Sequence, residues 1–281
     1  MNYLVVGGRG EAGQSAIEAI RSQAPEAWIA ATSSNETPVP GASSTIQGVD
    51  LADKEAPARI KTALGERAGQ LRALFFTPAF GPIGYPVRAA TPEDVREALQ
   101  FSFRPMVELS NSLNPKITVG YSAFYWLPHS LAGYGSMAYA KLALEQCAIK
   151  HPDRFRVVRA GTFRSQATRG IGLLLFRKIR NTPHPELQEL ASRFEKSDKK
   201  FTDFFFEHAF QTEEATYGVD FQSPHRPTTR ADLTLCNRRI LAGESAPIIN
   251  VLGDWIWTSD HLPELPEAFG LDHDPGKQYG V

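Results

Sequence analysis

Residues 3–13 read Tyr3-Leu-Val-Val-Gly-Gly-Arg-Gly-Glu-Ala-Gly13, an apolar run that ends in a glycine-rich turn. The glycines fit two spacings: Gly7, Gly10 and Gly13 match GxxGxxG, and Gly8, Gly10 and Gly13 match GxGxxG. Because residues 14–21 are typical of a helix, the stretch predicts a buried strand, a sharp turn and a helix N-terminus that can hold a pyrophosphate. The alternative is an ordinary strand-to-helix turn, and the surrounding sequence has to decide between the two.

The rest of the chain alternates short apolar runs with helical stretches, which is the pattern of a parallel sheet with crossover helices. The predicted strands are residues 3–6, 28–31, 45–49, 73–77, 116–120, 156–159 and 248–252, and the predicted helices lie near residues 13–23, 53–67, 92–112, 134–150 and 230–242. Thr91-Pro92-Glu93-Asp94 supplies an N-cap, a first-turn proline and first-turn acids, so a helix is expected to begin there. We therefore predict an α/β protein with a Rossmann-type doubly wound parallel sheet, built as a single domain from residues 1–281.

Composition limits the classes of function. The chain has 281 residues, 42% of them hydrophobic, and a formal charge of −1, so it can bury one substantial core and has no electrostatic reason to bind nucleic acid. Cys147 and Cys236 form no metal or disulfide pattern and are expected to be buried. No apolar run approaches the roughly 18 residues of a membrane span, and the N-terminus does not read as a leader. These features predict a cytoplasmic protein without a membrane partner.

Residues 171–227 interrupt the alternating pattern. This segment is rich in charge and in phenylalanine: Phe176, Phe194, Phe201, Phe204, Phe205, Phe206, Phe210 and Phe221. Since it follows the sixth predicted strand, it would hang over the carboxyl ends of the strands, where ligands bind. It is a candidate substrate lid, and the equal alternative is a helical insertion that packs its phenylalanines into the core or a subunit interface.

A second motif lies in Tyr134-Gly-Ser-Met-Ala-Tyr-Ala-Lys141. Tyr134, Met137 and Lys141 stand at i, i+3 and i+7, so a helix over this segment would place all three on one side. A lysine next to a tyrosine eases loss of the phenolic proton, and such a pair suits donation to an oxygen that becomes negative. Tyr139, two residues from Lys141, would project from another side.

These motifs together resemble the short-chain dehydrogenase/reductase superfamily over nearly the whole chain. The resemblance is carried by the glycine turn, Val49-Asp50-Leu51, Leu74 to Gly81, the Tyr134–Lys141 segment, Val157 to Arg164 and Ile249-Asn-Val-Leu-Gly253. In most of the superfamily the tyrosine precedes the lysine by four residues, a position that is Met137 here. The Tyr-x6-Lys spacing with a methionine between is similar to the bacterial enoyl-acyl-carrier-protein reductases, and so are Thr118-Val-Gly-Tyr121 and Arg156 to Ser165.

The resemblance implies a set of site residues. Lys141 would hold the nicotinamide ribose hydroxyls, and Tyr134 would donate a hydrogen bond to a substrate carbonyl oxygen while a hydride adds to the β-carbon of an enoyl thioester. The remaining implied positions are Tyr121 as a second wall or donor, Met137 and Phe163 in the substrate pocket, and Asp50, Leu51, Pro78, Ala79 and Thr162 at the cofactor. Taken alone, Tyr121 and Met137 would be core residues, and Lys141 would be a solvated helix lysine.

Cofactor choice depends on the end of the second strand, where an acid would bind the adenosine ribose and exclude a 2′-phosphate. Residues 31–35 carry hydroxyls, including that of Ser33, and an amide, with no acid before Glu36. Arg9 in the glycine turn could pair with a phosphate, although it could also be a surface turn residue. NADPH is therefore favoured over NADH.

The seven histidines show no metal-ligand spacing, and Asp272-His273-Asp274 is interpreted as a solvated tail, so no metal site is predicted. The favoured function is an NADPH-dependent reductase of a carbonyl-conjugated C=C bond, with a small-molecule or acyl-thioester substrate. The alternatives are a ketone reductase of the same fold and a non-catalytic nucleotide-binding member. The resemblance also implies a homodimer or homotetramer.

Overall fold

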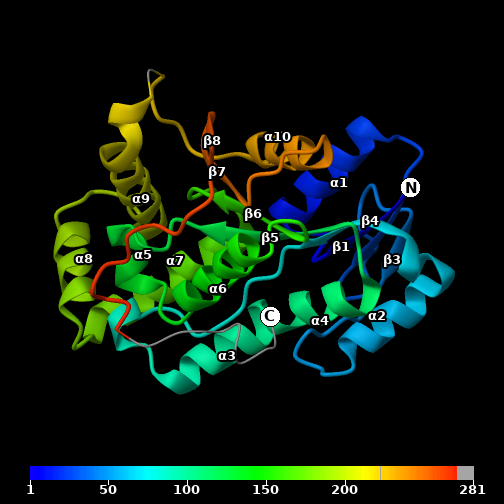
Figure 1. Cartoon of the computed structure of the whole chain (residues 1–281). Coiled ribbons are helices and arrows are strands. Elements are labelled where there is room, and N and C mark those ends of the chain that lie inside the picture. The colour runs from blue at the N-terminus through cyan, green and yellow to red at the C-terminus, as the bar shows by residue number, and fades with distance from the viewer. Residues whose placement is uncertain (222, 271–281) are drawn as a thin grey trace.

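The computed structural model describes residues 1–221 and 223–270, and the strands within them form one sheet in the order β3-β2-β1-β4-β5-β6-β7-β8 (Figure 1). The strands are β1 (Asn2–Val6), β2 (Trp28–Thr32), β3 (Ser44–Ile46), β4 (Leu71–Phe76), β5 (Ile117–Ala123), β6 (Phe155–Ala160), β7 (Ile248–Leu252) and β8 (Trp255–Ser259). Neighbouring strands are parallel except for β7 and β8. The order reverses between β1 and β4, which is the switch point where ligands bind in such sheets. The predicted doubly wound parallel sheet is thus confirmed.

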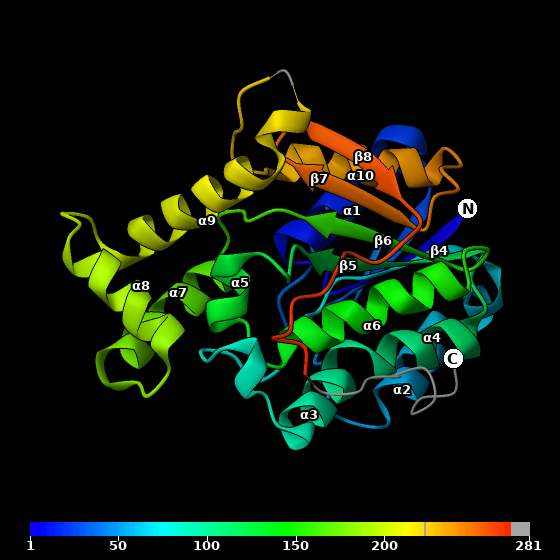
Figure 2. The same ribbon diagram turned by 60° about the vertical axis from the view of Figure 1, so that its left-hand side comes forward.

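Helices cover both faces of the sheet. The α-helices are α1 (Glu11–Gln23), α2 (Ala56–Leu64), α3 (Pro92–Ser102), α4 (Arg104–Leu113), α5 (Pro128–Gly133), α6 (Met137–Lys150), α7 (Gln166–Lys178), α8 (Pro185–Glu195), α9 (Phe201–Tyr217) and α10 (Arg230–Leu241). Short 3₁₀ turns are η1 (Gly65–Gln70), η2 (Val87–Ala89), η3 (Ile179–Asn181) and η4 (Gly218–Asp220). Figure 2 shows α1 and α10 together on one face and α2, α4 and α6 on the other.

The edge of the sheet differs from the prediction. A strand was expected over residues 248–252 and is present as β7, but the sequence reading missed β8, which returns antiparallel to it. The two are joined by a two-residue turn in which Gly253 has a φ of 59°, and Leu252 pairs with Trp255 across it. Such a turn needs a residue that tolerates positive φ, so the glycine allows the hairpin. At the other edge, β3 spans only Ser44–Ile46, whereas the strand was predicted over residues 45–49.

The helix expected over residues 92–112 begins where predicted and then divides. Thr91 and Asp94 form a reciprocal capping box, in which the Thr91 side chain accepts from the Asp94 amide and the Asp94 carboxylate accepts from the Thr91 amide. The helix ends at Ser102 because Pro105 has no amide hydrogen to continue it, and α4 starts with that proline in its first turn.

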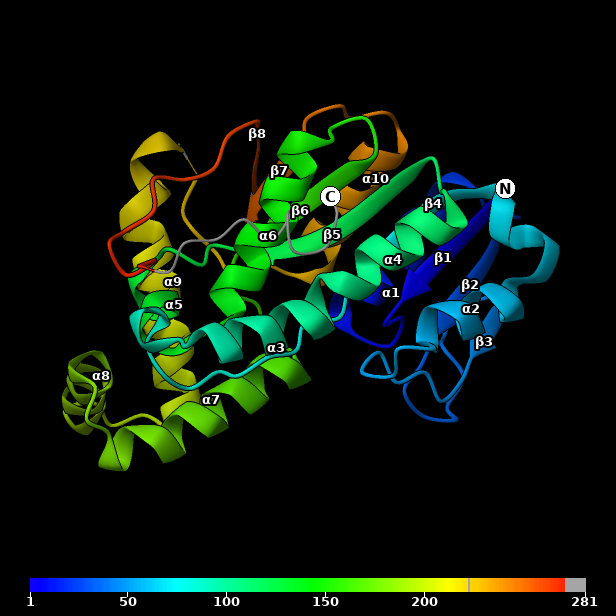
Figure 3. The same ribbon diagram turned by 60° about the horizontal axis from the view of Figure 1, so that its bottom comes forward.

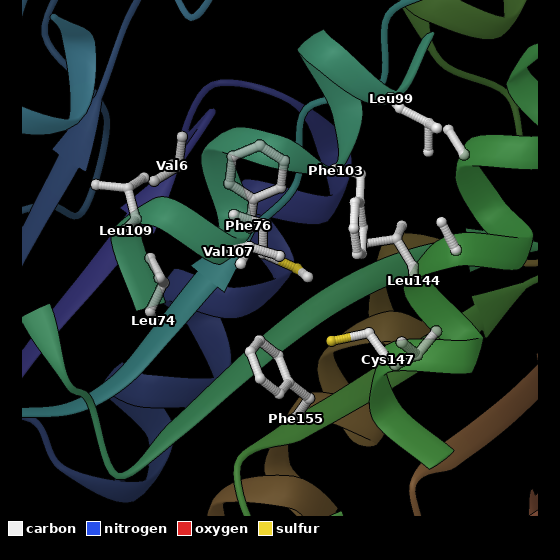
Figure 4. Packing of buried hydrophobic residues seen from close by; sticks show 14 of the residues in the cluster. Val6, Leu74, Phe76, Leu99, Phe103, Val107, Leu109, Leu144, Cys147 and Phe155 are labelled. Atoms are coloured by element: carbon white, nitrogen blue, oxygen red, sulfur yellow. The ribbon is translucent and has the colours of Figure 1, made fainter. Parts of the chain in front are cut away.

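The main core lies between the sheet and α2, α3, α4 and α6. Figure 4 shows its tightly packed part, in which Phe76 from β4, Phe103 and Val107 from the α3–α4 region, and Leu144 from α6 meet. A second core lies between the opposite face and the helices α1 and α10. Both cysteines are buried as expected, Cys147 in the first core and Cys236 in the second.

The insertion predicted over residues 171–227 is helical. Helices α7, α8 and α9 stand together at one end of the molecule (Figure 3). Its phenylalanines build a separate core in which Phe194, Phe201 and Phe204 pack with Leu187 and Leu190. This result is closer to the alternative of a helical insertion that packs its phenylalanines, because most of that aromatic surface is buried within the insertion itself. The role of the insertion as a substrate lid stays a prediction.

Two further observations concern residues 1–221 and 223–270. None of their helices has the length and apolar character needed to cross a membrane. Nor do these residues include a group of three or more His, Cys, Asp or Glu side chains that could hold a metal ion. Asp272, His273 and Asp274, interpreted as a solvated tail, lie outside the described residues.

Candidate functional site

The glycine turn connects β1 to α1 at the switch point of the sheet. Gly7 has a φ of 78°, and a Cβ built there would come within 2.6 Å of Thr77 Oγ1. A Cβ at Gly13 would overlap the Gly7 carbonyl oxygen, so the helix packs directly on the turn. Gly10 precedes the helix without a side-chain cap, and its amide donates to the Gly7 carbonyl at 3.2 Å. The result is an uncapped helix N-terminus at the carboxyl edge of β1, which suits an anionic group.

The end of β2 lies beside this turn. Arg9 Nη1 donates to Asn35 Oδ1 at 2.9 Å, and Ser33 Oγ donates to the same oxygen at 3.0 Å. Arg9 and Asn35 are exposed, whereas Ser33 is buried. The structure therefore brings together the predicted residues Arg9 and Ser33, and it adds Asn35, whose amide the site prediction had not included.

The positions predicted to border the cofactor lie on either side of the glycine turn. Pro78 lies against Gly7, since a Cβ at that glycine would come within 3.3 Å of its ring, and Ala79 follows it exposed to solvent. Asp50 is exposed and accepts the amide of Ala52 at 2.9 Å, so it shapes a turn, while Leu51 packs against the main core. These placements leave Asp50, Pro78 and Ala79 accessible to a ligand.

Lys141 is buried at the carboxyl end of β5. Its Nζ donates to the Tyr121 carbonyl oxygen at 2.8 Å, and only 4% of the residue's surface is exposed. Burial lowers the pKa of Lys141 to about 8, and the nearby Glu145 acts in the opposite direction. The interpretation as a solvated helix lysine is therefore wrong. An ammonium has three donors, so two remain for a ligand after the Tyr121 carbonyl is satisfied.

The prediction that Tyr121 forms a second wall of the same pocket is wrong. Its phenol donates to Asn237 Oδ1 of α10 at 2.9 Å and lies in the core on the α1 and α10 face. Side chains alternate along a strand, so Ser122 is the β5 residue that faces α6, where it donates to Glu145 Oε1 at 2.6 Å. Burial raises the pKa of Tyr121 well above its ordinary value, which keeps the phenol protonated.

Tyr134 does not share a helix with Lys141. The helix expected from residue 134 begins at Met137, because Tyr134 is the C-cap of α5 and Gly135 then takes a φ of 50°. Burial raises the pKa of Tyr134 to about 12. The predicted shared helix is therefore wrong, and the tuning of the phenol by the lysine stays a prediction. Within the described part of the chain, no group hydrogen-bonds the Tyr134 phenol, which leaves it as a protonated donor.

Met137 and Phe163 were predicted to line the substrate pocket. Met137 is 3% exposed and packs in the main core, with its sulfur 3.9 Å from Ser102 Oγ and close to Gly81. It fills the core rather than lining an open pocket, as methionine commonly does. Phe163 is half-buried and packs against the core on the α1 and α10 face.

Two buried polar groups were missed. Glu145 on α6 accepts hydrogen bonds from Ser122, Tyr125 and both donors of the Arg159 fork, the latter at 2.8 and 2.6 Å. Glu213 on α9 accepts the amide of Thr162, one of the predicted cofactor residues, at 2.6 Å. Glu145 could have been noticed four residues after Lys141, but the sequence offered no signal for its partner on β6 or for Glu213.

The residues of this edge fit a dinucleotide. Gly7, Gly8 and Gly13 form a cradle that any Cβ would fill, and the helix N-terminus behind it is uncapped. On the β2 side stand Arg9 and Asn35, and on the β5 side stands Lys141. A pyrophosphate at the turn would therefore have hydrogen-bonding groups available for a nucleoside on each side.

Comparison with known proteins is informative at the level of the fold. No protein-family model matches the sequence, and no curated protein matches it either. The structure is similar to the Pseudomonas aeruginosa RhlG/NADP active-site complex, with a TM-score of 0.58 and 15% identity over 90% of this chain and 94% of that one.

Two further structures match less well. Enoyl-acyl-carrier-protein reductase (NADH) from Aquifex aeolicus has a TM-score of 0.49 and 17% identity over 77% of this chain and 91% of its own. A short-chain dehydrogenase from Streptomyces avermitilis has a TM-score of 0.48 and 16% identity over 78% and 97%. At these scores the two carry no further argument. The chain thus has the Rossmann-type α/β fold of the RhlG structure, and that fold is what the comparisons establish.

Proposed function

We propose that the protein is an NAD(P)H-dependent oxidoreductase of the short-chain dehydrogenase/reductase type, which reduces a C=C bond conjugated to a carbonyl, such as that of an enoyl thioester. The observation that carries the proposal is the glycine cradle at the switch point with the buried Lys141 beside it. The fold shared with an NADP complex supports the same choice of ligand.

Each side chain has a separate task in this proposal. When bound, the reduced nicotinamide supplies a hydride. Lys141 uses one donor on the Tyr121 carbonyl and offers the others to ribose hydroxyls. Tyr134 has a pKa near 12, so its phenol stays protonated and donates to the substrate oxygen as negative charge develops there. Because burial raises its pKa, Tyr134 acts as a hydrogen-bond donor more readily than as a proton donor.

NADPH is the proposed form of the cofactor. The guanidinium of Arg9 is exposed beside Ser33 and Asn35, and no acid stands among residues 31–35 to repel a 2′-phosphate. A bidentate arginine suits a phosphate well. We expect NADPH to bind more tightly than NADH, and calorimetric titration with each measures the ratio of their Kd values. Equal affinities would contradict this part of the proposal.

The test of catalysis is Tyr134→Phe. Loss of one donor aimed at developing charge should lower kcat about a hundredfold or more, with nucleotide binding unchanged. Turnover is followed by the absorbance of the reduced nicotinamide with a matched pair of acyl thioesters, one an enoyl and one a β-ketoacyl compound. The control is Tyr3→Phe, which removes a phenolic hydroxyl on β1 that lies beside Met1.

The outcomes separate the alternatives. Turnover of the ketone in preference to the enoyl compound would support a ketone reductase. A second candidate is a nucleotide-binding protein without turnover. It is favoured by Met137, a core residue four positions before Lys141, where most of the superfamily carries the catalytic tyrosine. That candidate predicts nucleotide binding with no oxidation of the cofactor by any substrate and no effect of Tyr134→Phe. We also propose a homodimer or homotetramer, which light scattering tests.

A further inference from the structure

Glu213 is a carboxylate inserted into the body of the protein from the helical insertion. It lies on α9, is 0% exposed, and accepts the amide hydrogen of Thr162 through Oε1 at 2.6 Å. Its second oxygen faces Gly161, where a Cβ would come within 3.3 Å of it. Glu213 thus ties the insertion from its buried side to the segment that leaves β6, which Asp203 of the same helix also contacts through an exposed ion pair with Arg164.

Two buried histidines border this carboxylate. His225 Nε2 lies 3.4 Å from Glu213 Oε2, in a side chain that is 3% exposed. His129 Nε2 lies 3.3 Å from the hydroxyl of Thr162, and burial lowers the pKa of His129 to about 4. Three atoms of the cluster form no hydrogen bond of good geometry: Glu213 Oε2, His225 Nε2 and His129 Nδ1. Two of these atoms, Glu213 Oε2 and His225 Nε2, face each other.

The contrast with Glu145 shows why Glu213 is unusual. Glu145 is also 0% exposed, but it is paired with Arg159 and accepts several hydrogen bonds, which is what a structural buried carboxylate needs. Among the described residues, Glu213 accepts one firm hydrogen bond and has His225, but no arginine or lysine, as a possible ionic partner. A buried carboxylate so poorly compensated is costly to the fold, so a role beyond packing is the better explanation of its position.

The segment it holds lies on the far side of the glycine cradle from Arg9. β6 is three strands from β1, and strands are about 4.8 Å apart, so Thr162 lies roughly 14 Å across the sheet from the turn. A dinucleotide held at the switch point by its pyrophosphate places its two nucleosides on opposite sides. Since Arg9 marks the adenosine side, the Thr162 segment is on the nicotinamide side.

We propose that Glu213 is a positioning residue, which fixes the backbone of the Thr162 segment for the nicotinamide half of the cofactor and so makes the helical insertion part of the nucleotide site. The inference rests on the proposed function. It goes beyond that function because it assigns the insertion a role in holding the cofactor, in addition to covering a substrate.

The experiment compares binding of two probes to the full-length chain by calorimetry. NADP⁺ contains both nucleosides, whereas adenosine 2′,5′-bisphosphate contains only the adenosine half. Glu213→Met keeps the length of the side chain and removes the acceptor, and it should weaken NADP⁺ binding about tenfold while changing the Kd of the bisphosphate less than about twofold. Glu213→Gln retains an acceptor for the Thr162 amide and should restore most of the NADP⁺ affinity. Glu214→Met, on the exposed neighbour, is the matched control and should behave as wild type.

The ratio of the two Kd values is the decisive readout. A merely structural role of Glu213 would lower thermal stability but would leave this ratio unchanged. If Glu213→Met weakens both probes equally, or neither, the inference is overturned and the proposed function stands. If the wild-type chain binds neither NADP⁺ nor NAD⁺, the proposed function fails and the inference falls with it.

A measurement on the wild-type chain covers the case in which Glu213→Met does not fold. Hydrogen–deuterium exchange should show that NADP⁺ protects the Thr162 segment and the C-terminal half of α9 together, with α8 unchanged. Protection of the Thr162 segment without α9 would contradict the inference.

Discussion

Lys141 is buried, and among the described residues no acidic side chain forms a hydrogen bond with its ammonium. Its ammonium donates to the Tyr121 carbonyl, and Glu145, the acid that favours its charged form, is already paired with Arg159. Desolvation therefore dominates and lowers the lysine pKa to about 8 from 10.5. The sequence could place this lysine on a helix, but its burial depends on how closely α6 packs on β5, which involves residues far apart in the chain.

This shift has a consequence for stability. Between pH 8 and 10.5 the unfolded chain holds a proton on Lys141 that the folded chain does not, so stability rises with pH across that window. Below pH 8 the burial penalty, about 3 kcal/mol, is fully present. We expect Lys141→Met to be more stable relative to wild type below pH 8 than near 10.5. Urea unfolding of both proteins at the two pH values measures the difference, and a constant difference would show that no such penalty exists.

At the scale of elements, breaks between helices decide which groups meet. Gly135 separates α5 from α6, and its amide donates to the Tyr85 carbonyl at 3.0 Å while Ser136 donates to the Pro82 carbonyl at 3.1 Å. The spacing of Tyr134 and Lys141 suggested one continuous helix. Contacts with the segment at residues 82–85 favoured a left-handed residue at Gly135 instead, because glycine takes that conformation without a steric penalty.

Gly135→Ala tests the importance of this break. The alanine would be strained at a φ of 50°, and its Cβ would lie 2.8 Å from the Pro82 oxygen. We expect the free energy of unfolding to fall by about 2 kcal/mol or more, with kcat falling as Tyr134 loses its position. Gly170→Ala is the control, since it lies within α7 with open space around the added Cβ and should stabilise by roughly 0.5–1 kcal/mol. An equal effect of the two changes in urea unfolding would contradict this account.

At the scale of the whole molecule, polar pairs join elements that lie far apart in the sequence. Arg159 on β6 connects Glu145 on α6 with Asn250 on β7, and Arg230 on α10 binds Glu11 at the start of α1 through two hydrogen bonds of 2.6 and 2.8 Å. The insertion is connected differently. Its phenylalanine core is separate from the two cores that flank the sheet.

A separate core predicts separate unfolding. Leu187 is 0% exposed in the insertion, so Leu187→Ala should cost about 2–5 kcal/mol there. We expect faster hydrogen exchange in α7, α8 and α9 and unchanged exchange in β4 and β5. Leu173→Ala, at a leucine 50% exposed on α7, is the control and should stay within about 0.5 kcal/mol of wild type. Equal acceleration of exchange in the sheet would show that the insertion and the sheet unfold as one unit.

The sequence by itself determined the seven parallel strands of the sheet, the glycine cradle and the capped start of α3. These depend on local patterns: apolar runs of strand length, glycines where a side chain would collide with the turn, and a threonine followed by an acid at the helix start. It also placed Arg9 and Ser33 at the same edge, because the ends of neighbouring parallel strands meet there.

Only the tertiary structure decided which side chains share the site. Tyr121 faces α10 because side chains alternate along β5. An error of one residue in assigning which β5 side chain faces the site therefore moves that side chain to the opposite face of the sheet. Glu213 reaches Thr162 across a distance of 51 residues in the chain. No local pattern encodes such a contact, since it arises from the packing of a whole insertion against the end of a strand.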